Sequence, residues 1–230
     1  MEFELKASTE AGKRMVALAE KHASDFALTA AENDLKGMFP VENIREMQKS
    51  GFAAAAVPEE FGGMGVTSIH DCVVAMNRLG RAEGSTPLAF TMHLSRTMST
   101  VRARRNAIAA GNKKAQSLSE DLLKKIGAGD LMITVANSER GANIRTSRTL
   151  ATKVDGGWLF NGTKTFATGS PAANMLAVRA RYENKAGEQR MGAALVPVDR
   201  PGVEIMNTVS YTHLRAHETL RYLVCRLLLE

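Results

Sequence analysis

The chain has 230 residues, of which 44% are hydrophobic and 23% are charged, and its formal net charge is +6. These values are close to those of globular proteins, and they argue against a disordered, collagen-like or coiled-coil chain. The basic residues are spread along the sequence with few aromatic residues among them, so no nucleic-acid partner is expected.

The order of residues indicates neither a leader nor a membrane span. The chain begins Met1-Glu2-Phe3-Glu4, without the basic and then apolar layout of a signal peptide. No apolar run approaches the roughly 18 residues of a membrane helix. The two cysteines, Cys72 and Cys225, are too few for a disulfide framework and lack zinc-ligand spacing. We therefore expect a cytoplasmic protein with reduced thiols, no metal and no membrane span.

The first half of the chain has the periodicity of helices. Met15, Leu18, Ala19 and Phe26 fall on one helical face, which predicts a long helix over 8–33 that begins at Ser8 or Thr9. Further helices are predicted over about 40–51, 69–80, 88–105 and 117–127, and the spacing of Ser117 and Glu120 predicts a capping box for the last one. Residues 1–128 are therefore assigned to an all-helical N-terminal domain.

After Gly129 the apolar period falls from about 3.6 to 2, which is typical of strands. Strands are predicted over 131–136, 150–154, 157–160, 163–168, 175–182 and 191–198, and another begins at Val203. The Asn161-Gly162 dipeptide predicts a hairpin turn between 157–160 and 163–168. Helices followed by strands, without alternation, favour an α+β fold in which 129–206 form a β domain.

The last segment, 207–230, differs from what precedes it. It holds 2 of the 5 histidines, and the strand pattern stops there. The peptide from Ser210 to Thr219 resembles a translated sequencing-library adapter. We hypothesise that 207–230 is a non-native tail and that the native sequence ends near Met206.

Local catalytic motifs are weak. The sequence has no phosphate-binding glycine loop of the Walker or dinucleotide type and no GxSxG elbow, and its histidines are scattered. On these patterns alone the chain is an α+β globular protein without an assigned activity.

Three ordered segments nevertheless resemble a known family. They are Phe39-Pro40-x-x-Asn43-Ile44 with Gly51-Phe52 and Val57-Pro58-Glu59-Glu60-Phe61-Gly62-Gly63-x-Gly65; Asn161-Gly162-x-Lys164-x-Phe166-x-Thr168-Gly169; and Pro201-Gly202-Val203. Together, over roughly 7–206, they resemble the N-terminal and middle domains of the acyl-CoA dehydrogenase superfamily of FAD flavoproteins.

This resemblance implies an all-helical N-terminal domain followed by an incomplete antiparallel β-barrel or sandwich-like domain. The family's C-terminal helical bundle is missing from the chain, and FAD lies between the β domain and that bundle. Since the family's catalytic base sits on the bundle or the segment leading to it, no catalytic residue is named here. The truncated chain is expected to be inactive alone.

The resemblance places flavin contacts in two segments. They comprise Val135, Ala136, Ser138 and Gly141 in the first, and Phe166, Ala167 and Thr168 in the second. Phe166 stands where the family usually has a Trp that covers a ring face, and Thr168 matches a Thr that reaches the flavin. The alternatives are a buried strand aromatic and a half-buried strand Thr. Two registers stay open, because either Ser138-Glu139 or Ala136-Asn137 matches the family's Thr-Glu pair.

Two further positions are assigned to substrate by the resemblance. His93 matches a histidine near the flavin and substrate cavity, and its alternative is a core-edge helix histidine. Ala142 and Asn143 replace the family's Ser-Asp pair, a departure that weakens the case for acyl-CoA binding more than the case for flavin binding.

The implied activity is FAD-dependent α,β-dehydrogenation of an acyl-CoA thioester, in which a base removes the α proton while hydride leaves the β carbon for flavin N5. One alternative is a flavin-dependent monooxygenase of the same fold, and another is a non-functional fragment. The expected partners are acyl-CoA or another small molecule, an electron-transfer partner, and further copies of the full-length protein in a homo-oligomer.

Overall fold

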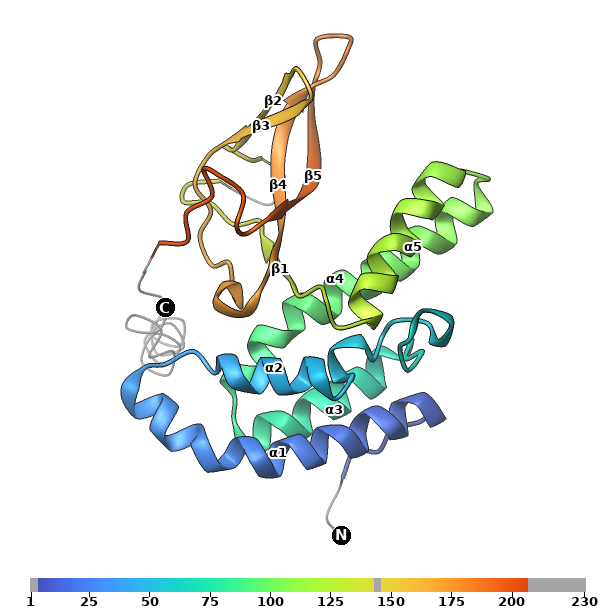
Figure 1. The fold of residues 1–230 in the computed structure, drawn as a ribbon, viewed down its shortest axis with the longest axis vertical. Coiled ribbons are helices and arrows are strands. Elements are labelled where there is room, and N and C mark those ends of the chain that lie inside the picture. Colours follow the sequence, from blue (N-terminus) through green and yellow to red (C-terminus); the bar gives the residue numbers. More distant parts are fainter. Residues whose placement is uncertain (1–3, 143–145, 207–230) are drawn as a thin grey trace, which may run out of the picture.

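The computed structural model describes residues 4–142 and 146–206. Helices form one part of the molecule, and a β-sheet stands on them (Figure 1). The helices are α1 (Glu10–Lys36), α2 (Val41–Lys49), α3 (Ile69–Ala82), α4 (Ser85–Ala109) and α5 (Lys113–Gly127). The predicted all-helical N-terminal part is therefore confirmed.

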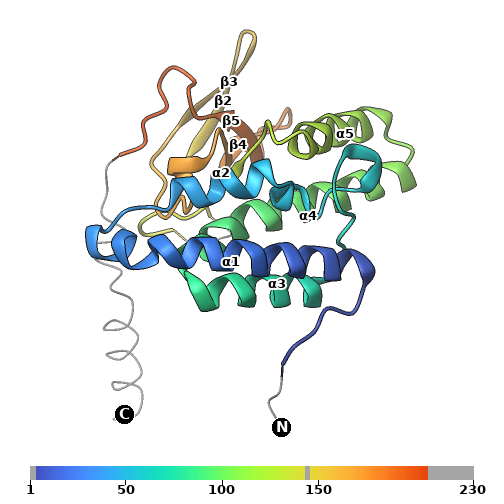
Figure 2. The same ribbon diagram turned by 60° about the horizontal axis from the view of Figure 1, so that its bottom comes forward.

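Helix α1 begins where the sequence predicts. The Thr9 hydroxyl accepts a hydrogen bond from the Gly12 N–H at 2.9 Å, which satisfies one of the free donors of the first turn. The helix runs beside α3 (Figure 2). It ends at Gly37, whose φ of 61° is a left-handed conformation that glycine adopts without strain.

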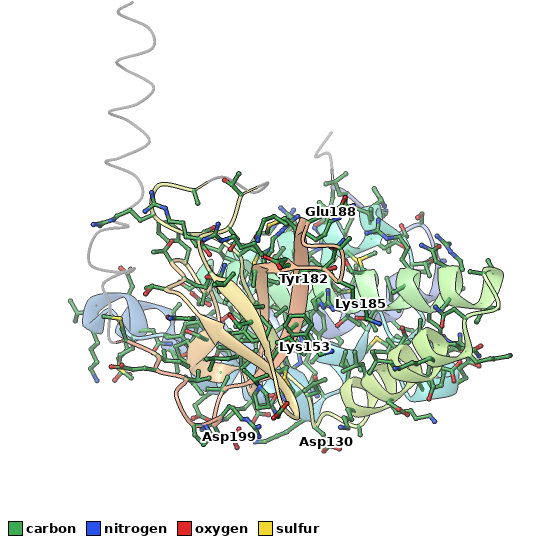
Figure 3. All side chains as sticks on the ribbon, turned by 90° about the horizontal axis from the view of Figure 1, so that it is seen from above. Asp130, Lys153, Tyr182, Lys185, Glu188 and Asp199 are labelled. Carbon is green, nitrogen blue, oxygen red and sulfur yellow. The ribbon has the colours of Figure 1, made fainter. Side chains whose placement is uncertain are left out.

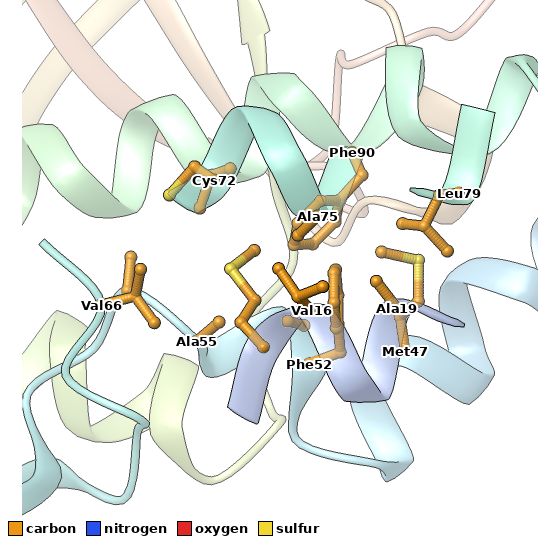
Figure 4. Close-up of a cluster of buried hydrophobic side chains, with 14 of the residues drawn as sticks. Val16, Ala19, Met47, Phe52, Ala55, Val66, Cys72, Ala75, Leu79 and Phe90 are labelled. Atoms are coloured by element: carbon orange, nitrogen blue, oxygen red, sulfur yellow. The ribbon is translucent and has the colours of Figure 1, made fainter. Parts of the chain in front are cut away.

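The helical core lies between α1, α2, α3 and α4 (Figure 4). Its largest members are fully buried and include Met15, Met47, Phe52, Leu79 and Phe90. Phe52 belongs to the short 3-10 helix η1 (Phe52–Ala54), and its ring packs at 5.4 Å from that of Phe90 on α4. Burial of such aromatic rings contributes a large share of the stability of a small domain.

The predicted capping box of α5 is wrong. The helix begins at Lys113, and the Asn112 side chain accepts from the Ala115 N–H at 3.0 Å, so that Ser117 lies inside the helix. Asn is as good an N-cap as Ser. Here it follows Gly111, whose φ of 64° ends the preceding helix, and the chain therefore has its cap before Ser117 is reached.

The sheet contains β1 (Ile133–Ala136), β2 (Leu150–Val154), β3 (Gly157–Asn161), β4 (Met175–Glu183) and β5 (Gln189–Pro197). It is open, as predicted. It is mixed and not wholly antiparallel, because β1 and β2 both run parallel to β4, one at each end of it. β5 pairs antiparallel with the whole of β4 along the other edge.

The sheet has two ends with different neighbours. Lys185 lies in the turn that joins β4 to β5, with Tyr182 and Glu188 beside it (Figure 3), whereas Asp130 precedes β1 and Asp199 follows β5 at the other end. The second end faces the helices, since β1 contacts α4. This end of the sheet is where the candidate site is built.

The predicted hairpin at Asn161-Gly162 is wrong. β3 pairs with β2, and the two-residue connection is Asp155-Gly156, with Gly156 at φ 80°. Residues 163–168 form no strand and make a single bridge, from Thr165 to Ser138. Asp-Gly and Asn-Gly are both favourable turn sequences, so the pairing of β2 decides between them. The strand predicted to begin at Val203 is also absent, since residues 203–206 have no strand pairing.

Candidate flavin and substrate site

The two segments expected to contact flavin lie side by side in the structure. The Thr134 hydroxyl on β1 donates a hydrogen bond to the carbonyl of Thr168. The Thr165 N–H donates to the Ser138 carbonyl at 2.9 Å. Residues 134–138 and 165–168, separated by the β2–β3 ribbon, therefore form one surface.

A buried ion pair joins the same two segments. The Glu139 carboxylate, 3% exposed, accepts from Lys164 Nζ. It also accepts from the Ser147 and Thr149 hydroxyls, both at 2.6 Å, and from the backbone N–H groups of Arg148 and Thr149. Burial alone would raise the pKa of this carboxyl, but these donors, Lys164 foremost, hold its pKa well below the usual range.

The sequence gives no sign that Glu139 is a structural residue, because only its contacts in the fold show the buried ion pair. The sequence offered Ser138-Glu139 as one match to the family's Thr-Glu pair. In the structure the Glu139 carboxylate is buried, and both of its oxygens accept hydrogen bonds from protein donors. Glu139 is thus a structural residue, and the two registers stay open as predictions, with Ala136 as the last residue of β1 and Asn137 directly after it.

Phe166 occupies an unusual backbone conformation. Its φ is 56°, and no other non-glycine residue in the described part of the chain has a positive φ. A left-handed conformation is unfavourable for a residue with a Cβ and clusters at functional sites. The residue is 64% exposed and lies outside any strand, so the alternative of a buried strand aromatic does not hold. The Thr168 hydroxyl lies beside it and donates to the Phe166 carbonyl at 3.5 Å.

Glycines allow the two segments to approach their neighbours closely. Gly169, at φ 91°, lies where a Cβ would be 3.4 Å from the Ala89 carbonyl of α4. Gly141, at φ 72°, lies against the Arg148 guanidinium, with 3.0 Å between a Cβ position and the nearest nitrogen. Ala142 follows on the loop and donates its N–H to the Glu139 carbonyl at 3.3 Å. Its neighbour Asn143 lies outside the described residues, as does the segment 207–230.

His93 joins the helices to the sheet. Its Nδ1 accepts from the Ile133 N–H at 3.0 Å, so its Nε2–H donates to the Ala53 carbonyl at 3.1 Å. The side chain is fully buried, and burial lowers its pKa to about 4. With both ring nitrogens engaged and no exposed surface, His93 has no group to offer a substrate. The expected substrate contact stays a prediction, and the buried ring with two backbone partners fits its alternative, a core-edge helix histidine.

A cavity of about 470 Å³ opens between α4, β1, β4 and β5. Its walls contain Ser95, Arg96, Ser99, Val135, Asn137, Ala177, Arg179, Met191, Gly192 and Ala193. Val135 is the one residue among the expected flavin contacts that lines it. The two arginines were missed by sequence analysis because only the fold brings α4 and β4 to one cavity.

Within the described ranges, no group of three or more His, Cys, Asp and Glu side chains is arranged to hold a metal ion. Over the same residues, none of the helices combines the length and apolar character that crossing a membrane requires.

Family models match two parts of the chain. The acyl-CoA dehydrogenase N-terminal domain matches residues 9–104, and the acyl-CoA dehydrogenase middle domain matches residues 133–221. The amino sugar nitrososynthase RubN8 of Streptomyces rubradiris is 31% identical over 93% of this chain and 49% of its own length. The putative acyl-CoA dehydrogenase YdbM of Bacillus subtilis is 32% identical over 84% of this chain and 49% of its own.

The chain is also similar to a crystal structure of KijD3 in complex with FMN and a dTDP-linked amino sugar. The identity is 30% and the TM-score 0.80, over 89% of this chain and 48% of KijD3. The chain thus spans about half the length of the relatives it matches. The matched domains, the order of the motifs and the shared fold lead to one conclusion: the chain belongs to the acyl-CoA dehydrogenase superfamily of flavin-dependent oxidoreductases.

Proposed function

We propose that this chain forms the flavin-binding face and the substrate cavity of a flavin-dependent monooxygenase that oxidises a polar, amine-bearing small molecule. The observation that favours a polar substrate is the presence of the guanidinium groups of Arg96 and Arg179 in one part of the cavity wall; a protonated amine of the substrate would lie away from these cations. The likeness to an amino sugar nitrososynthase supports the same choice.

The surface around Phe166 fits a flavin ring. An exposed aromatic ring offers a flat apolar face, and the neighbouring Thr168 hydroxyl and the end of β1 offer polar groups at its side. When bound, a flavin supplies the redox chemistry of the reaction. Phe166 would cover one face of the ring, and Thr168 would bind its polar edge. FMN is favoured over the expected FAD, because KijD3 was crystallised with FMN.

A long hydrocarbon chain is a poor occupant of this cavity. Apolar groups packed against Arg96 and Arg179 would remove water from two cations without replacing their hydrogen bonds. Polar groups of a small substrate would accept those bonds instead. The two arginines thus disfavour an acyl tail in their own part of the cavity, whereas the wall formed by Val135, Ala177 and Met191 is apolar.

Acyl-CoA dehydrogenation remains the second candidate, because YdbM is a comparably similar relative. That reaction needs a carboxylate base at the substrate α carbon. None of the described residues that line the cavity is an Asp or Glu. A dehydrogenase would therefore take its base from another part of the protein.

The two functions are separated by a paired assay. The chain is loaded with FMN or FAD, alone and after fusion to the C-terminal half of RubN8, and that half alone is the control. In one arm the flavin is photoreduced and mixed with oxygen and a dTDP-linked amino sugar, and the expected product has gained one oxygen atom by mass spectrometry. In the other, acyl-CoA is added to oxidised flavin. Flavin bleaching by acyl-CoA without oxygen transfer would contradict the monooxygenase proposal.

A further inference from the structure

The cavity between α4 and the sheet concentrates positive charge. Arg96 comes from α4 and Arg179 from β4, and the hydroxyls of Ser95 and Ser99 and the amide of Asn137 share the same walls. No described residue of these walls is acidic. The two serine hydroxyls donate their protons to carbonyls of α4, so the donors left for a ligand are the guanidinium groups and the Asn137 amide. A site with two cations, an amide donor and no carboxylate is complementary to an anion.

Neither arginine of this cavity is paired with a carboxylate among the described residues. Arg78, Arg104 and Arg190 form ion pairs with glutamates. Arg96 forms none, and its Nε is buried without a hydrogen-bond partner. Leaving a buried donor unsatisfied costs about 1–3 kcal/mol. Because this atom has no accessible surface, it does not face the cavity, and what the cavity offers a ligand is the unpaired charge of the two guanidinium groups.

We infer that this cavity is an anion subsite in which Arg96 and Arg179 hold a phosphate-type group. Two guanidinium groups present planar pairs of N–H donors, which match the oxygens of a phosphate in a bidentate arrangement. A volume of about 470 Å³ also admits a phosphate with part of the molecule that bears it. The inference deepens the proposed function and rests on it, because it makes the substrate an anionic small molecule or assigns the phosphate of the flavin itself to this cavity.

The test titrates the chain with inorganic pyrophosphate at low salt by isothermal calorimetry. Arg96→Met and Arg179→Met should each weaken binding by at least about tenfold, the effect of losing one charge-assisted interaction. The pyrophosphate affinity of Arg96→Lys should lie between that of the Met variants and that of the wild type, because lysine keeps the charge without the planar donors. Circular dichroism and thermal unfolding establish that each variant is folded.

The matched control is Arg105→Met. Arg105 is exposed on the same helix, and its position nine residues further along places it on the opposite face from Arg96. This variant removes the same net charge and should leave pyrophosphate binding unchanged. Absence of pyrophosphate binding to the wild-type chain at millimolar concentration, or equal binding by Arg96→Met, Arg179→Met and wild type, would overturn the inference.

A second set of titrations identifies the source of the phosphate. If the group belongs to the flavin, Arg96→Met weakens binding of FMN but not of riboflavin. If it belongs to the substrate, Arg96→Met weakens binding of dTDP, and the affinities for FMN and for riboflavin are both unchanged. Both results support the subsite. Wild-type chain that binds pyrophosphate but no flavin contradicts the proposed function alone, and chain that binds riboflavin but no phosphate compound contradicts the subsite alone.

Discussion

At the scale of single residues, the site depends on polar groups that are buried and paired. Both ring nitrogens of His93 form hydrogen bonds with backbone groups, and Glu139 accepts hydrogen bonds from Lys164 and three further residues. Such groups hold a loop or a strand in one position, because any shift leaves a desolvated polar atom without a partner. They stabilise the surface on which flavin is proposed to lie, without touching it.

The burial of His93 makes stability dependent on pH. Its folded pKa is about 4, below the value of about 6.5 in an unfolded chain, so the unfolded state binds the proton more readily between these values. Above pH 6.5 His93 is neutral in both states and does not lower stability. As the pH falls towards 4, the unfolded state takes up the proton, and the free energy of unfolding falls by about 3 kcal/mol. Urea unfolding from pH 7 to pH 4 should show this decline.

The variant His93→Gln provides the comparison for that series. Glutamine keeps one acceptor and one donor but does not titrate, so its free energy of unfolding should fall less over the same range. The titration of the carboxylates changes the free energy of unfolding equally in both proteins. Parallel curves for the variant and the wild type would show that His93 is not buried in its neutral form.

Breaking the buried Glu139–Lys164 pair should cost far more than breaking a surface pair. Removing one partner of a buried ion pair leaves an uncompensated charge, so Lys164→Met should lower the free energy of unfolding by about 3–5 kcal/mol. Arg190→Met, which breaks the exposed pair with Glu188, should cost less than about 1 kcal/mol. Urea denaturation measures both. Similar losses in the two variants would mean that Glu139 is solvated in solution.

At the scale of elements, the apolar periodicity of the sequence predicted the helices and strands. The five helices and the strands β1 to β5 were all anticipated, with shifted ends, because their apolar faces repeat at 3.6 or 2 residues. In the segment 163–168, apolar and polar residues alternate as in a strand, but the segment forms no strand. Its course is set by Lys164 reaching Glu139 and by Thr165 bridging to Ser138. Neither contact has a signal in a short window of sequence.

The exit from β3 depends on a glycine for space. A Cβ on Gly162 would lie 2.3 Å from the Thr149 hydroxyl oxygen and 2.7 Å from the Thr149 Cα. Gly162→Ala should therefore destabilise the protein by about 1–3 kcal/mol, because backbone has to move. Gly157→Ala, at the start of the same strand, meets no atom within 4 Å and should change stability little. Thermal unfolding of the two variants gives the comparison, and equal midpoints would contradict the close packing of β3 on Thr149.

At the scale of the whole molecule, a buried hydrophobic cluster joins the helices to the sheet, with Leu123 and Ile126 of α5 packed in one cluster with Ile133 of β1 and Ala177 of β4. The Ile133 N–H also bonds to His93 of α4. The order of the family's motifs predicted that residues 134–138 and 165–168 would serve one site, and they do lie together. It could not predict the arginine-lined cavity, because Arg96 and Arg179 belong to no motif and meet only through the packing of α4 against the sheet.

The most direct test of the account is a fluorescence titration of FMN with the chain. Stacking of an aromatic side chain on a planar ring is worth about 1–3 kcal/mol, so Phe166→Ala should weaken FMN binding about tenfold or more. Trp158→Ala removes another exposed aromatic side chain of the sheet and should leave the affinity unchanged. FMN quenching that is lost in Phe166→Ala and kept in Trp158→Ala is the predicted result. No binding to the wild-type chain, or equal binding by all three proteins, would contradict the flavin surface described here.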